Sequence, residues 1–198
     1  MSLELITGNP REVGIILYKA LERLITNRND DGFFKDAVEV TSKNYFSTLE
    51  GLDAILIPLV NLPKNLFWEP LKESYPQLLR IINDDITYIL SKNKASISPP
   101  DIQGEPYFTI KKAGRIAPYW SSECSSFTLS VLTNYLKLSN LFGLVSKPEE
   151  SQQVVDSIKT NLDWLKLCRD DSDPGWAWTT DLHLVHPWPT WSILDTFE

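Results

Sequence analysis

The sequence predicts an all-α protein in which outer and inner helices alternate, and two observations carry this prediction. Segments with one apolar face alternate along the chain with segments that are apolar around most of their circumference. In addition, one order of features occurs near both ends of the chain. It consists of an amphipathic helix, an acidic turn that closes on a glycine and an aromatic residue, and an apolar helix that opens with Thr-x-x-x-Leu-Asp.

The repeat is clearest in its first and last copies. The first has the turn NDDGFF and the restart STLEGLDAIL, and the last has SDPGWAW and PTWSILDTFE. Gly32 precedes Thr48 by nearly the same distance as Gly175 precedes Thr190. A degenerate middle copy keeps the threonine as Thr128. We therefore expect about three outer and inner helix pairs within a single domain, residues 1–198.

The first outer helix is predicted to begin at Pro10. Asn9 is suited to the N-cap, proline to the first helical position, and Glu12 completes a capping box. The apolar face expected to be buried contains Val13, Ile16, Leu17, Ala20, Leu21 and Leu24.

The next two helices have contrasting patterns. Residues 45–60 are apolar on nearly all sides and predict an inner helix, with Pro58 in its last turn. The segment from Pro76 has a one-sided stripe and predicts an outer helix, with Asp84 and Asp85 outside the stripe. The stripe contains Leu78, Leu79, Ile82, Ile86, Ile89 and Leu90.

Residues 96–118 are the least helical part of the sequence, because Pro99, Pro100, Gly104 and Pro106 interrupt any helical pattern. Residues 107–110 predict a short strand or an extended arm. A connection of this length is either a binding loop or a local addition to the fold.

The second half of the chain repeats the alternation. Residues 119–145 predict a long inner helix with Gly143 as its terminator, and residues 146–149 form another capping box. The outer helix that follows should bury Val154, Val155, Ile158, Leu162 and Leu165. A last inner helix should open at Pro189 and Thr190.

Composition limits the classes of function. The formal net charge of −7 argues against a nucleic-acid surface, which needs clustered lysine and arginine. Two cysteines, Cys124 and Cys168, are too few for a disulfide framework. The sequence has no apolar run of about 18 residues and no signal peptide pattern, so we expect no membrane span and a cytoplasmic location.

The shared order of turns and apolar restarts resembles the repeats of the prenyltransferase and squalene-cyclase superfamily. This resemblance implies an incomplete α/α toroid with a long irregular loop at about 96–118, in which inner helices line an aromatic cavity. An irregular helical bundle or α-solenoid is the alternative. Because a closed toroid of that family takes about six pairs, and because the last helix stops uncapped at Glu198, we expect a fragment or a half toroid. A protein partner, further chain or a second copy would complete it.

The resemblance also implies acidic motifs, which this sequence only partly contains. Asp171 and Asp173 are the candidates for the catalytic aspartates of the cyclases, but Pro174 follows where a third carboxylate belongs. The pairs Asp84-Asp85 and Asp170-Asp171 lack the further aspartate of the family's magnesium motif. The alternative for these aspartates is a solvated helix end or turn.

Zinc ligation in the family's protein prenyltransferases uses Asp, Cys and His. The candidates here are Glu123, Cys124 and His186, residue types that suit zinc. Pro189 stands where the family's histidine is expected, and Glu123 is adjacent to the cysteine. The alternative is a buried cysteine that acts as a small hydrophobic residue, with His183 and His186 packed against tryptophans.

The resemblance gives the aromatic residues a role as the lining of a ligand cavity, in which π faces would stabilise cations. The alternative is that the tryptophans at the Gly-Trp turn pin outer to inner helices. The candidates for the cavity are Trp176, Trp178, Trp188, Trp191, Tyr119 and Trp120.

The scaffold signals therefore survive in this sequence, whereas the catalytic motifs are absent or broken. We expect a non-catalytic, toroid-like helical module that mediates protein–protein interaction, without a cofactor. The alternative is the N-terminal part of an isoprenoid cyclase or prenyltransferase-like enzyme. Such an enzyme would bind a hydrophobic prenyl substrate and use Mg²⁺ or Zn²⁺.

Overall fold

The computed structural model describes residues 10–26, 45–61, 73, 76–92, 109–112, 115–118, 122–142, 148–169, 175–177 and 187–197. These residues are mostly helical, which confirms the predicted fold class at the level of all-α. The helices are α1 (Pro10–Thr26), α2 (Tyr45–Asn61), α4 (Leu78–Lys92), α5 (Ser122–Phe142), α6 (Pro148–Leu167) and α7 (Pro187–Phe197). The strands β1 (Thr109–Lys112) and β2 (Arg115–Pro118) form one hairpin.

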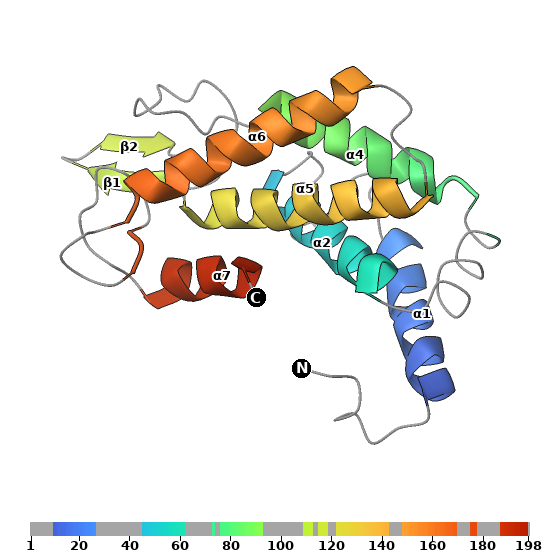
Figure 1. Cartoon of the computed structure of the whole chain (residues 1–198). Coiled ribbons are helices and arrows are strands. Elements are labelled where there is room, and N and C mark those ends of the chain that lie inside the picture. Colours follow the sequence, from blue (N-terminus) through green and yellow to red (C-terminus); the bar gives the residue numbers. More distant parts are fainter. Residues whose placement is uncertain are drawn as a thin grey trace.

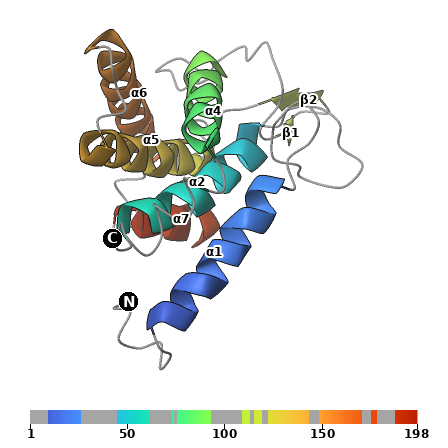
Figure 2. The ribbon, with the colours of Figure 1, turned by 90° about the vertical axis from the view of Figure 1, so that its right-hand side faces the viewer.

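The helices are arranged around a central layer formed by α2 and α5, which pack against each other. Helices α4 and α6 lie on one side of this layer, and α1 and α7 lie on the opposite side (Figures 1 and 2). Helix α5 also contacts α6 and α7, whereas α2 contacts α1 and α4. The sequence predicts α2, α5 and α7 to be inner helices. In the structure α2 contacts α5 and α5 contacts α7, so each of these helices packs against the next.

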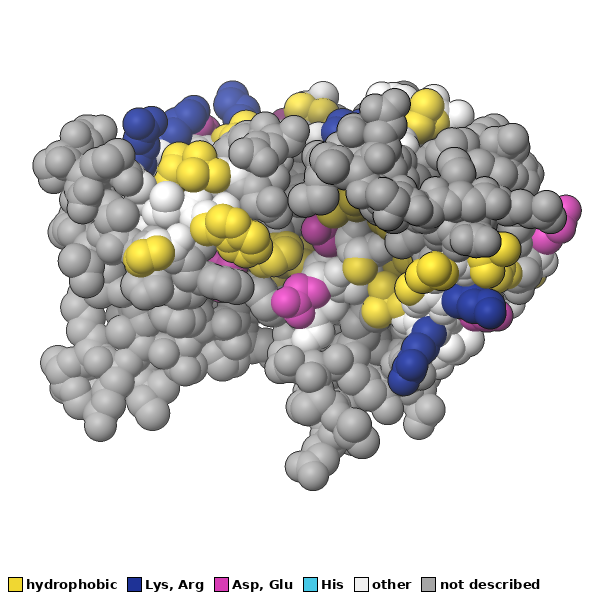
Figure 3. All heavy atoms as spheres, turned by 90° about the horizontal axis from the view of Figure 1, so that it is seen from below, with side chains coloured by type: hydrophobic (Ala, Val, Ile, Leu, Met, Phe, Trp, Pro, Cys, Tyr) yellow, Lys and Arg dark blue, Asp and Glu magenta, His cyan; other side chains and the backbone are white. Residues whose placement is uncertain are grey.

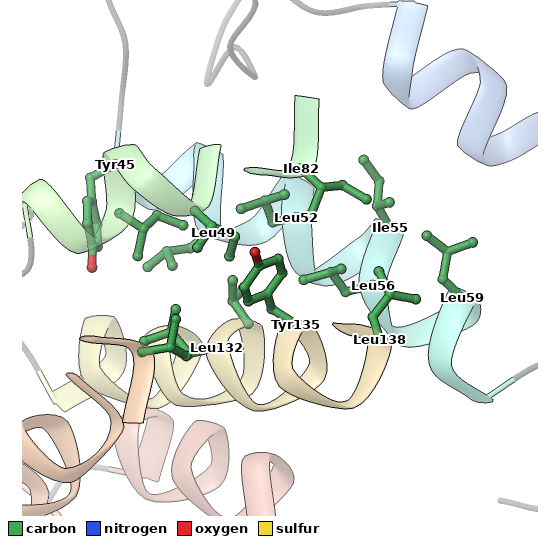
Figure 4. Close-up of a cluster of buried hydrophobic side chains, with 14 of the residues drawn as sticks. Tyr45, Leu49, Leu52, Ile55, Leu56, Leu59, Ile82, Leu132, Tyr135 and Leu138 are labelled. Carbon is green, nitrogen blue, oxygen red and sulfur yellow. The ribbon is translucent and has the colours of Figure 1, made fainter. Parts of the chain in front are cut away.

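The main core lies where α2, α4 and α5 meet. Leu52 and Leu56 of α2 point toward Tyr135 of α5, and Ile82 of α4 lies beside Leu52 (Figure 4). Burial of α2 on most of its sides agrees with its predicted character as an inner helix. The side chains in this core that are almost completely buried include Leu49, Leu52, Ile55, Leu56, Ile82, Ile89, Leu132 and Leu138.

Polar side chains tie the three core helices together. The hydroxyl of Thr128 donates to the carbonyl of Cys124, so the Tyr45 hydroxyl, 3.0 Å from Thr128 Oγ1, is the donor between α2 and α5. On the same pair of helices, Ser130 Oγ donates to Asp53 Oδ1 at 2.6 Å.

A similar bond joins α5 to α4, because Tyr135 Oη donates to Asn83 Oδ1 at 2.9 Å. Hydrogen bonds in buried surroundings have strict distance and angle requirements. The three core helices are therefore fixed in register as well as packed together.

Several helix ends lie where the sequence predicts them, although α7 begins at Pro187, two residues before the predicted start at Pro189. Helix α1 begins at Pro10, α6 begins at Pro148 within its predicted capping box, and α5 ends directly before Gly143. Pro58 lies inside the last turn of α2, as predicted. The predicted N-cap Asn9 and the terminator Gly143 themselves lie outside the described residues.

Predictions of burial are wrong for residues in three helices. Asp85, expected outside the apolar stripe of α4, is completely buried, and Val155, expected in the buried face of α6, is exposed. In α1, Ile16 and Ala20 are exposed, and the buried side is centred on Leu21 and Ile25. Periodicity identifies the apolar face of a helix, but it does not show whether a neighbouring element covers that face.

The hairpin occupies the segment predicted to be least helical. Strands β1 and β2 are antiparallel, with Thr109 paired with Pro118 and Lys112 paired with Arg115. Of the segment 107–110, predicted as a short strand or an extended arm, residues 109 and 110 belong to β1, and residues 107 and 108 lie outside the described residues. The partner strand β2 was not predicted.

The outer surface of α6 carries solvated charges, as expected for an outer helix. Lys166 Nζ lies 2.8 Å from Asp163 Oδ1, and the hydrogen bond and charge of Lys166 lower the pKa of Asp163. Such exposed pairs stabilise a fold very little.

Within the described residues, no helix combines the length and the apolar character that a membrane crossing requires.

Candidate functional site

The most closely connected polar contacts surround the turn between α6 and α7. We call this region the junction: the end of α6 (165–169), residues 175–177, Thr190 of α7 and Ser122 of α5. Residues 169 and 176 form an isolated antiparallel bridge, and the backbone N–H of Ala177 donates to the carbonyl of Cys168 at 2.9 Å. The chain is thus folded back onto the end of α6 before α7 begins.

Trp176 links the two helices on either side of the turn. Its indole Nε1–H donates to the carbonyl of Leu165 on α6 at 3.1 Å, and its backbone N–H donates to Thr190 Oγ1 on α7 at 2.9 Å. The guanidinium of Arg169 lies 5.7 Å from the centre of a Trp176 ring, within the range of cation–π attraction. These contacts favour the pinning role for Trp176, and its cavity role stays a prediction.

The junction also holds the first turn of α5. Ser122 Oγ donates to the carbonyl of Ala177 at 2.7 Å, and both residues are buried. A longer hydrogen bond of 3.4 Å joins Thr196 Oγ1 of α7 to the carbonyl of Ser126. Ser122 therefore holds residues 175–177 against the start of α5, and Thr196 joins α7 itself to α5.

One side of α7 is buried by these contacts. Ile193 is completely buried and packs with Leu129 of α5 and Leu165 of α6. Another side of α7 is largely exposed: Trp191 and Leu194 retain 57% and 51% of their maximal exposure. They are three residues apart on a helix and lie on one side of it. We call these two residues the α7 face.

The repeat shows how the residues that correspond to the α7 face are buried in the other two copies. When the chain is aligned on Thr48, Thr128 and Thr190, Trp191 corresponds to Leu49 and Leu129. Leu49 and Leu129 are both buried in the structure.

Leu194 corresponds to Leu52 and Leu132, which are also both buried. In the first two copies, helices of the following pair supply cover: Ile82 of α4 lies beside Leu52, and Leu165 of α6 beside Leu129. The described residues contain no such pair after α7.

The structure describes two of the three predicted metal ligands. Glu123 is half-buried in the first turn of α5, and Cys124 beside it is buried. His186, like His183, lies outside the described residues, so the zinc site of Glu123, Cys124 and His186 stays a prediction. Among the described residues, no group of three histidine, cysteine or acidic side chains is suited to hold a metal ion.

The remaining site predictions fall mostly beyond the part of the chain that the structure describes. Trp188 belongs to α7, but its side chain is outside that part. The predictions for these residues as catalytic or cavity-lining groups stay predictions. The residues that lie outside are Tyr119, Trp120, Asp171, Asp173 and Trp178.

Sequence reasoning identified Thr190 as the mark of a repeat but did not assign its contact with Trp176. The signal was present, because the first and last copies place a Gly-aromatic pair at nearly the same distance before the threonine. Comparison with protein-family models, curated proteins and solved structures finds no match. Function must therefore be inferred from the geometry of this chain.

Proposed function

We propose that the chain is a non-catalytic, toroid-like helical module that binds another protein through the α7 face. The observation that carries this proposal is the exposure of Trp191 and Leu194 at repeat positions that are buried in the first two copies. Tryptophan is enriched among the residues that contribute most to binding at interface centres, and exposed apolar patches mark interaction sites.

The rigidity of α7 supports the same role. Helix α7 is held by Trp176 on one side and by the contacts of Ile193 and Thr196 on the other. A surface that is already ordered loses little conformational entropy when a partner binds. The junction therefore serves to present the α7 face in a fixed position.

Photo-crosslinking tests this role. A benzophenone amino acid is placed at Leu194, and in a matched control at Lys137, an exposed residue of α5. In cells that naturally express the chain, we expect position 194 to form an adduct with one protein, identified by mass spectrometry, and position 137 to form none with it. Identical adducts from both positions, or none from position 194, would contradict the proposal.

The non-catalytic part of the proposal has a separate test. Titration calorimetry of the purified chain with a long prenyl diphosphate is carried out with and without Mg²⁺ or Zn²⁺. We expect no saturable heat under either condition. Saturable, metal-dependent binding would instead support the enzyme alternative and direct mutagenesis to Glu123, Cys124 and His186.

A further inference from the structure

A second apolar face lies at the other end of the series of helices. Ile15 and Ile16 of α1 are exposed, Ile16 to 66%, and Ile57 of the adjacent α2 is also exposed. We call Ile15, Ile16 and Ile57 the α1 face. Seen from the side of α1 and α7, hydrophobic side chains gather in two areas, one toward α7 and one toward α1, with acidic side chains between them (Figure 3).

The exposure of Ile16 is unexpected from the sequence. Ile16 lies on the apolar stripe of α1, yet within the chain this helix packs mainly against α2, through Leu21 and Ile25. When the apolar stripe of a helix is wider than the surface that its one neighbouring helix covers, part of the stripe stays exposed to water. The α1 face therefore has the character of a surface that lacks a neighbour.

We propose that each face is covered by the other in a second copy of the chain, so that α7 of one copy packs against α1 and α2 of its partner. This inference rests on the proposed interaction through the α7 face. Within the chain, α2 is followed by the outer helix α4, which packs against it, and α5 is followed by the outer helix α6, which packs against it. The element that continues this series after α7 is an outer helix with its inner helix, and α1 with α2 is such a pair.

The positions of the two faces allow this contact to close. Helices α1 and α7 lie on the same side of the central layer and at opposite ends of it (Figures 1 and 2). Two copies related by a twofold axis then form two identical contacts, each between α7 of one copy and α1 of the other. Head-to-tail contacts of this kind give a closed ring when the rotation between copies closes, and an open filament when it does not.

Charge substitutions and mixing test the arrangement by sedimentation velocity on the full chain. We expect the wild-type chain to be a dimer. Ile16→Glu and Leu194→Lys should each weaken the dimer by more than about tenfold, because each buries an unpaired charge. Val155→Lys, at an exposed apolar position on the opposite side of the molecule, is the matched control and should leave the dimer unchanged.

Mixing the Ile16→Glu and Leu194→Lys chains should restore a dimer. In the mixed dimer one contact is wild type, and the other places a lysine against a glutamate. A dimer that Leu194→Lys breaks but Ile16→Glu does not would show pairing of α7 with α7 and overturn the proposal. A mixture that stays monomeric would also overturn it.

A wild-type chain that is monomeric at every concentration would overturn the second copy as the partner. The crosslinking result then separates the two proposals. An adduct from position 194 to a different protein leaves the interaction role standing, whereas the lack of any adduct removes both.

Discussion

Trp176 and Thr190 show how single residues fix the position of a whole helix. Trp176 donates one hydrogen bond to α6 and one to α7, and Thr190 supplies the acceptor on α7. The threonine could be identified from the sequence because it recurs in each copy. Its contact with Trp176 was not assigned, although the Gly-aromatic pair before the threonine was the available signal, because spacing alone does not show which groups form a hydrogen bond.

Replacing Thr190 by valine tests this contact. The valine keeps the shape of the side chain but removes the acceptor, which leaves the half-buried N–H of Trp176 without its partner. We expect Thr190→Val to lower the free energy of unfolding by about 1–3 kcal/mol, measured by urea denaturation. Thr133→Val, at an exposed position of α5, is the control and should change it by less than about 0.5 kcal/mol. Equal effects of the two substitutions would contradict the role of Thr190.

At the scale of the elements, packing of α2 against α4 and α5 provides most of the described core. Leu52 is completely buried beside Ile82 and Tyr135. Truncation of such a side chain removes apolar contacts and leaves a cavity that the fixed helices cannot fill.

We therefore expect Leu52→Ala to lower the free energy of unfolding by about 2–5 kcal/mol, measured in the same denaturation experiment. Leu141→Ala on α5 is the matched control, since Leu141 is largely exposed, and its effect should be below about 0.5 kcal/mol. If Leu52→Ala lowers the free energy of unfolding by no more than the control does, α2 is not packed in this core.

Features that depend on residues close together in the chain could be predicted from the sequence, whereas features that depend on distant residues could not. Helix starts at Pro10 and Pro148 were predictable because capping depends on residues close together in the chain. Burial of Asp85 and exposure of Val155 were not, because both depend on which helix crosses at that point. Strand β2 was missed for a related reason, since residues 115–118 show no alternation strong enough to predict a strand without their partner.

At the scale of the whole molecule, the described helices form a series with an apolar face at each end. Ile16 of α1 and Leu194 of α7 are both exposed although both belong to apolar stripes of the sequence. The sequence could indicate these stripes but not which of them the chain itself would cover. The two uncovered faces are the basis of the proposed interaction and of the proposed closure by a second copy.

Thiol labelling of a Leu194→Cys chain tests the central claim, that the α7 face is covered by a protein partner, most directly. Both native cysteines are buried, so the introduced thiol is the accessible one. A Lys137→Cys chain is the matched control. In cells that naturally express the protein, we expect Cys introduced at 194 to react with a maleimide at least about tenfold more slowly than in the dilute purified chain, as burial of the thiol in an interface requires. The control should react equally fast in both settings, and equal rates for position 194 as well would contradict the claim.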